Sequence, residues 1–123
     1  IVKMLNSGKG GQMIFEPAVL KVSIGDTIHF KATDAAHNSA SIEGMLPDGA
    51  KSWAGELSKD ISVVLDKEGV YVYQCDPHVM MAMVGVIQVG NASNIESIKA
   101  SAASKKSSFM LNTERLDEYL ARL

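Results

Sequence analysis

The chain has 123 residues with a formal net charge of −2, and 46% of them are hydrophobic. This length fits one domain, the apolar content excludes a disordered chain, and the charge offers no overall attraction to nucleic acid or to an anionic membrane. No apolar run approaches the roughly 18 residues of a spanning helix, so we expect a soluble protein without membrane insertion.

The first third of the chain predicts short strands separated by turns. Strands are expected at Val2–Asn6, Met13–Pro17 and Val19–Val22, and the glycine-rich residues 7–12 predict a hairpin between the first two. After the turn signal Gly25-Asp26, residues 27–31 alternate, with Ile28 and Phe30 on one face. His29 lies on the other face and is expected to meet solvent.

Residues 34–60 show little periodicity, which predicts a long functional loop, and we expect Trp53 to anchor it. Further strands are expected at Ile61–Leu65, Val70–Gln74 and Val84–Val89, with Asp66–Gly69 as a hairpin turn between the first two. Six or more short strands predict an all-β sandwich.

After Gly90 the composition shifts to Ser, Ala and Lys, which ends the sheet. Ile95 and Ile98 predict one short helix, and Asn112 or Thr113 is expected to cap a second. We expect residues 91–123 to form a helical extension packed on the sandwich of residues 1–90, within a single domain. The apolar stripe of the second helix comprises Leu116, Tyr119, Leu120 and Leu123.

Cys75, His78 and Met83 lie close together just before the last predicted strand. A lone cysteine is most often a buried hydrophobe, but a histidine and a methionine in the same loop favour a soft metal ion. Two histidines, a cysteine and a weak axial methionine form the electron-transfer copper arrangement, whereas structural zinc sites use no thioether. Pro77 stiffens the loop by fixing its own φ.

A second histidine ligand must come from a distant segment, and two histidines compete for the position. The strand alternation turns His29 toward solvent, while His37 lies in a loop, where isolated histidines are commonly surface residues. Met80 and Met81 are either adaptable core filler or an apolar collar around His78. In the second case Met13 joins the collar from the first hairpin, and His78 with these methionines forms the electron entry and docking surface.

Several segments resemble, in the same order, the pseudoazurin group of the cupredoxins, which are small type 1 (blue) copper proteins. These segments are Met13–Pro17, Gly25–Thr27, His37–Asn38, Met45–Ala50, Cys75–His78 and Met81–Met83. The tail 91–123 is similar too, and plastocyanin and amicyanin lack such a tail. The resemblance implies a cupredoxin-like Greek-key β-sandwich with a C-terminal extension of two α-helices.

The resemblance also implies one copper ion per chain, held by His37, Cys75, His78 and Met83. It implies that the backbone N–H of Asn38 bonds the cysteine sulfur and that its side chain joins the two ligand loops. Pro77 lies between two of these ligands.

The resemblance implies an electron-transfer protein, not an enzyme, that acts as a monomer between transient partners. Nitrite reductase or a c-type cytochrome is the expected partner, and the expected location is the periplasm, as a mature chain without its signal peptide. A start at Ile1 hints at export. Multicopper oxidases flank the cysteine with histidines, whereas Gln74 and Asp76 flank it here. The alternative is a copper carrier or storage protein without a shuttle role.

Some residues depart from the family pattern around the exposed histidine. Ala35, Ala54, Glu56 and Gln74 stand where pseudoazurins often carry lysine, and Asp76 adds a negative charge. Electrostatic complementarity governs encounter rate and partner choice, so these departures bear on the partner and leave the copper assignment as it stands.

Overall fold

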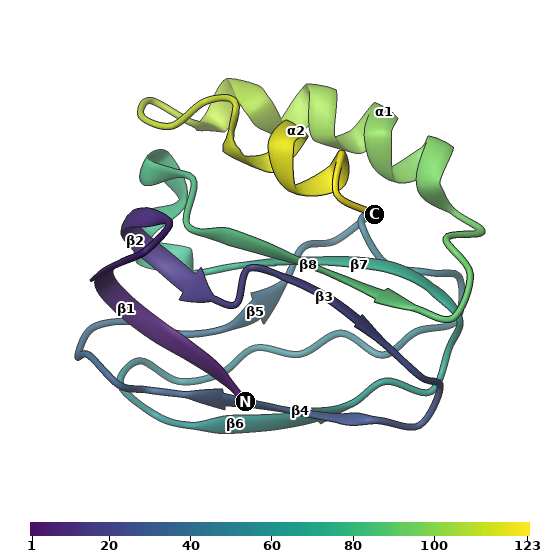
Figure 1. Ribbon diagram of the computed structural model, residues 1–123, viewed down its shortest axis with the longest axis horizontal. Helices are drawn as coiled ribbons and strands as arrows, with labels where there is room; N and C mark the ends of the chain where they lie inside the picture. The colour runs from purple at the N-terminus through teal and green to yellow at the C-terminus, as the bar shows by residue number, and fades with distance from the viewer.

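Two four-stranded sheets face each other in the computed structural model, which describes residues 1–123 (Figure 1). The all-β sandwich expected from the sequence is confirmed. The first sheet has the order β2-β1-β4-β6, made of β1 (Val2–Gly8), β2 (Gly11–Glu16), β4 (Thr27–Lys31) and β6 (Ile61–Val64). The second has the order β3-β8-β7-β5, made of β3 (Val19–Val22), β8 (Val84–Val89), β7 (Gly69–Gln74) and β5 (Ala40–Ser41).

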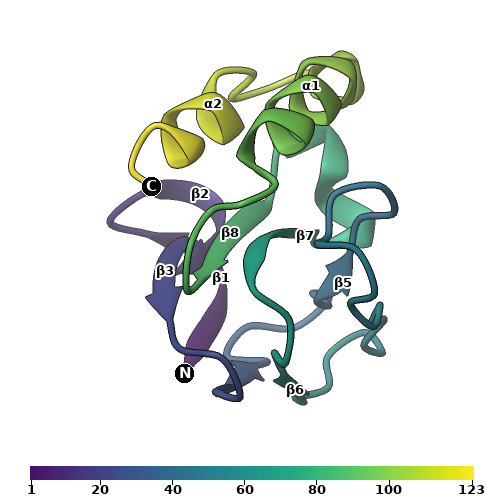
Figure 2. The same ribbon diagram turned by 90° about the vertical axis from the view of Figure 1, so that its right-hand side faces the viewer.

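Helices cover the outer face of the second sheet, as both views show (Figures 1 and 2). They are α1 (Ile95–Lys105), the short 3-10 turn η2 (Lys106–Ser108) and α2 (Arg115–Leu120), while a further 3-10 segment, η1 (Asp76–Met81), precedes β8. The predicted stripe is confirmed for Leu116, Tyr119 and Leu120, which are buried. No helix combines the length and apolar character needed to cross a bilayer.

Two apolar layers result, one on each face of the second sheet. Strand β7 shows how: Tyr71 and Tyr73 enter the core between the sheets, whereas Val70 and Val72 enter the core beneath the helices. This follows from the two-residue period of a strand. Because both faces of β7 are covered, its C-terminal end delivers Cys75 into a fully buried position.

The predicted hairpin at Asp66–Gly69 is wrong. Strand β6 pairs with β4 in the first sheet, and β7 pairs with β8 and β5 in the second, so the connection crosses between sheets. The burial of the two strands explains the outcome. Strand β6 alternates between half-buried and exposed residues, while β7 needs cover on both faces, which only the helix-covered sheet supplies.

The predicted cap of the second helix is also wrong. The residue before α2 is Glu114, and no side chain caps the helix. Asn112 has a left-handed φ of 54°, unlike the extended backbone of a capping residue, and its side-chain amide donates to the carbonyl of Met81 at 3.2 Å.

The long segment 34–60 contains only the two-residue strand β5 and an isolated bridge between Ala40 and Ala54. Trp53 anchors it, as predicted. The indole N–H donates to Ser39 Oγ at 3.0 Å, and the ring stacks on Phe30 with centroids 6.1 Å apart. This anchor fixes the start of the loop, where His37 lies.

Candidate metal centre

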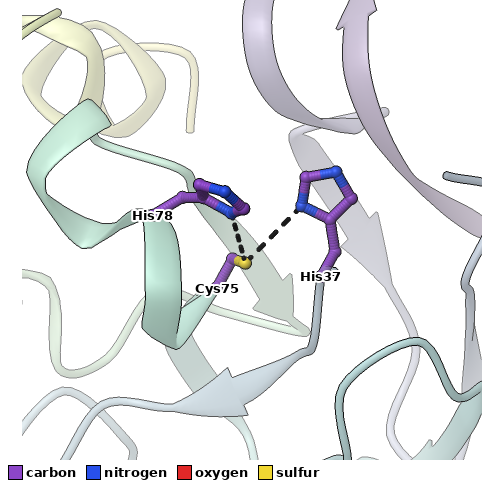
Figure 3. Close-up of side chains that lie close together, drawn as sticks. All are labelled: His37, Cys75 and His78. Carbon is purple, nitrogen blue, oxygen red and sulfur yellow. Dashed lines mark hydrogen bonds between the residues drawn. The ribbon is translucent and has the colours of Figure 1, made fainter. Parts of the chain in front are cut away.

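Three donor side chains from two distant loops converge at one end of the sandwich. Cys75 Sγ lies 3.2 Å from His78 Nδ1 and 3.7 Å from His37 Nδ1 (Figure 3). Figure 3 shows His37 approaching from the side opposite to the segment that carries Cys75 and His78. Among the chain's acidic, cysteine and histidine side chains, these are the three that could hold a metal ion together.

Backbone hydrogen bonds hold the segment from Cys75 to Met83 as a closed loop. The N–H of His78 donates to Cys75 O at 3.1 Å, the N–H of Met83 to His78 O at 3.3 Å, and the N–H of Cys75 to Met83 O at 2.9 Å. Pro77 sits in the first turn of η1, where a missing N–H costs nothing. Met83 is fully buried and shares the inter-sheet core with Cys75.

Asn6 orients His37, a contact that no sequence pattern indicates. His37 Nε2 lies 2.7 Å from Asn6 Oδ1, which only accepts hydrogen bonds, so Nε2 carries the proton. The other nitrogen, Nδ1, therefore keeps its lone pair and faces the cysteine sulfur. Asp34 Oδ2 accepts from the main-chain N–H of Asn6 at 2.7 Å and steadies this support.

Asn38 joins the two loops. Its Oδ1 accepts from the N–H of Asp76 at 2.8 Å, and its Nδ2 donates to Asp76 Oδ2 at 2.9 Å and to Gly55 O at 3.0 Å. These side-chain contacts join the two ligand loops as the family resemblance implied, and the bond from the backbone N–H of Asn38 to the cysteine sulfur stays a prediction.

Burial governs the protonation of the donors in the metal-free chain. Burial raises the pKa of the Cys75 thiol, while backbone N–H groups of Asn38 and His78 oppose the rise. Burial, and then the nearby His78, lowers the pKa of His37, with Asp34 acting in the opposite direction. Both shifts favour the neutral forms, because a charge without a partner is costly in this environment.

The donor set fits a soft metal ion. One thiol and two imidazoles face one another, and the carboxylate of Asp76, next to Cys75 in the chain, has its oxygens occupied by Gln74 and Asn38. Sulfur and imidazole donors without carboxylate favour copper or zinc over magnesium and calcium.

The remaining predicted residues are partly or largely exposed to solvent. His78 is half-buried, as are Met13 and Met81, while Met80 is 60% exposed. His29 faces solvent, as its strand position predicted, and its Nδ1 lies 2.7 Å from Ser62 Oγ, away from the cluster. A docking role for the methionines stays a prediction.

Residues 2–90 match the family model described as copper binding proteins of the plastocyanin/azurin family. The chain belongs to this family. Pseudoazurin from Methylorubrum extorquens is 43% identical over 123 residues, covering 99% of this chain and 80% of the relative. The crystal structure of a Methylobacterium extorquens pseudoazurin has a TM-score of 0.85 at 42% identity, covering 98% of this chain and 95% of that one. Native pseudoazurin from Hyphomicrobium denitrificans has a TM-score of 0.89 at 36% identity, with coverages of 99% and 95%.

These findings confirm the cupredoxin resemblance and the fold. The helical tail lies outside the residues that the family model matches, yet the pseudoazurin relatives cover it. The chain is a copper-binding electron carrier of the cupredoxin family rather than an enzyme.

Proposed function

We propose that His37, Cys75, His78 and Met83 hold one copper ion as a type 1 site and that the chain carries one electron between protein partners. The observation that supports this most is the convergence of two imidazole Nδ1 atoms on one buried thiol, with His37 reaching Cys75 from 38 positions away in the chain and His78 from three. Met83 would supply the fourth, thioether donor in this proposal, because its backbone is hydrogen-bonded to both Cys75 and His78.

Copper bound at such a site supplies one-electron chemistry between Cu(II) and Cu(I). The contribution of the chain is a rigid frame. Asn6 fixes the ring of His37, Asn38 fixes the loop carrying Cys75, and two backbone hydrogen bonds fix Met83 relative to Cys75 and His78. Donors held in this way keep one arrangement in both oxidation states. His78 is the half-buried donor and offers the route to a partner.

The proposed partner is a redox protein that docks briefly, such as a nitrite reductase or a c-type cytochrome. Redox encounters use small interfaces, below about 1,200 Å², and release quickly. We further propose that the chain works as a monomeric, single-domain protein in the periplasm. The pseudoazurin relatives support this setting.

Copper titration of the purified chain tests the ligand set. One equivalent of Cu(II) is expected to give an intense blue thiolate band, which is lost in Cys75→Ser, His37→Gln and His78→Gln. His29→Gln is the matched control because His29 lies outside the cluster, and it is expected to keep the band. Met83→Leu is expected to change the spectrum, whereas Met110→Leu, at a residue 74% exposed, leaves it unchanged. A blue band that survives in Cys75→Ser overturns the proposal.

A copper carrier remains the second candidate, since its soft ligands are similar. Electron paramagnetic resonance of the Cu(II) form separates the two functions. A square-planar signal with rapid metal exchange favours the carrier, and a type 1 signal with rapid electron self-exchange favours the shuttle.

A further inference from the structure

Arg115 is a buried cation that no ion pair neutralises. It is 8% exposed, and Lys106 is the only basic side chain of the chain that forms an ion pair. Burying a charge is costly unless hydrogen bonds satisfy it. Its guanidinium therefore needs strong acceptors, and each acceptor that it finds is a main-chain carbonyl.

These carbonyls belong to two segments that are distant in the sequence. Nη1 donates to the carbonyls of Met13 at 3.0 Å, Met81 at 3.3 Å and Ala82 at 3.3 Å, and Nη2 donates to Gln12 at 3.1 Å. In Figure 1 the β1–β2 turn, η1 and the loop before α2 lie at the same end of the molecule. Arg115 thus ties the C-terminal helix to both the first hairpin and the loop that carries the donors.

Two of these acceptors have unusual backbones. Met13 and Ala82 have positive φ angles of 52° and 56°, a region that residues other than glycine avoid and keep only when their surroundings hold them there. Carbonyls at the end of a helical turn also lack partners within that turn and attract a cation. The guanidinium of Arg115 holds the positive-φ residues Met13 and Ala82 in place and supplies a partner to the free carbonyls. Gly11 leaves space for this guanidinium, because a Cβ at that position would lie 3.2 Å from Nη2.

The Ala82–Met83 peptide is where this contact reaches the metal centre. Its C=O accepts from Arg115, and its N–H donates to His78 O at 3.3 Å. The next carbonyl, that of Met83, accepts from the N–H of Cys75 at 2.9 Å. The orientation of this peptide therefore fixes where the backbone of Met83 lies relative to Cys75 and His78.

We propose that Arg115 is a positioning residue for the copper site, which sets the placement of Met83 by holding the Ala82–Met83 peptide from the C-terminal helix. The inference rests on the proposed role of Met83 as a ligand. Asn112 supports the same loop through its bond to Met81 O, and the N–H groups of Met110 and Leu111 bond Met80 O at 2.7 and 3.0 Å. The helical extension thereby acts on the site without supplying a ligand.

Amide hydrogen exchange of the metal-free protein tests the positioning without copper. In Arg115→Met, exchange at the N–H groups of Met83 and Cys75 is expected to accelerate about tenfold or more, which corresponds to one lost bond to a charged group. Arg115→Lys keeps the charge but not the fork of donors, and it is expected to fall short of wild type. Arg122→Met is the matched control, because Arg122 is exposed and contacts the ring of Tyr119, not the loop.

The copper-loaded variants supply the second readout. The ratio of the thiolate absorption bands and the rhombicity of the resonance signal report the axial ligand, and both are expected to change in Arg115→Met and Arg115→Lys but not in Arg122→Met. Asn112→Ala is a milder variant, expected to shift the same signals less.

The inference is overturned if Arg115→Met leaves the Met83 and Cys75 amides and the spectra at wild type. It is equally overturned if exchange at a distant core amide, such as that of Val72, rises by the same factor, because Arg115 would then serve global stability alone. Failure of the proposed function looks different, since the wild-type chain would then form no blue complex.

Discussion

Replacing Asn38 by alanine separates the two ligand loops at their main contact. The substitution removes three hydrogen bonds, one of them to a carboxylate, from a side chain that is only 4% exposed. Neutral bonds contribute about 1 kcal/mol each and a charged one somewhat more, and Asp76 is exposed to solvent, so the expected loss is about 3 kcal/mol in the free energy of unfolding. That is a large share of the roughly 5 to 15 kcal/mol of a typical domain.

Urea unfolding of the metal-free chain measures this loss, and the rate of copper release to a chelator measures its effect on the site. Release is expected to be faster in Asn38→Ala, because His37 and Cys75 then lie on loops that move independently. Asn91→Ala is the matched control, since only the main-chain N–H of Asn91 is hydrogen-bonded, and its effect should stay within about 0.5 kcal/mol.

A third variant, Asn38→Asp, keeps an acceptor for the N–H of Asp76 but places a carboxylate against that of Asp76. It is expected to be no more stable than Asn38→Ala at neutral pH, because like charges at hydrogen-bond distance repel. A loss below about 1 kcal/mol in Asn38→Ala, or Asn38→Asp at wild-type stability, refutes the view that this side chain holds the loops together.

Other predictions concern the core and the pH response. The buried hydroxyl of Tyr73 has no hydrogen-bond partner, so Tyr73→Phe is expected to raise the free energy of unfolding by about 1 kcal/mol in urea, and a clear decrease contradicts this. A Cβ at Gly85 would lie 2.3 Å from the Tyr73 ring, so Gly85→Ala is expected to cost about 3 kcal/mol, against under about 1 kcal/mol for Gly10→Ala, where the nearest atom is 3.7 Å away. Because the pKa of His37 is lowered by burial and then by His78, the metal-free chain binds fewer protons folded than unfolded. The contribution of neutral His37 to the free energy of unfolding is fully present above the ordinary histidine pKa of 6.5 and is lost as the pH drops below it. His37→Gln is therefore expected to flatten the urea midpoints measured across that range.

The loop with Cys75, His78 and Met83 was accessible from sequence because its donors are neighbours in the chain. Their spacing alone indicated a soft metal site, and the strand period gave the exposed position of His29. The choice of His37 rested on family resemblance, since no local pattern distinguishes a loop histidine that reaches a distant thiol from one that faces solvent.

Strand pairing was harder to predict than strand position. The residues of β6 and β7 were correctly expected to be strands, yet a four-residue connection serves equally for a hairpin and for a crossing between sheets. The outcome depends on which other elements can bury the two faces of each strand. One face of β7 is buried by helices that follow it in the sequence. Information of this kind is absent from the segment itself.

The residues that hold the metal ligands in place, Asn6 and Arg115, could not be predicted from the sequence. Asn6 acts through an amide oxygen that many polar residues could supply, and Arg115 acts through main-chain carbonyls that every residue type carries. A metal ligand can be recognised in a sequence because few residue types can bind the metal. A main-chain carbonyl that accepts a hydrogen bond cannot be recognised, because every residue type carries one. The same reasoning predicts that substitutions at Gln12 and Met81 that keep the backbone in place leave the contacts of Arg115 intact, while changes at Arg115 itself are not compensated by any neighbour.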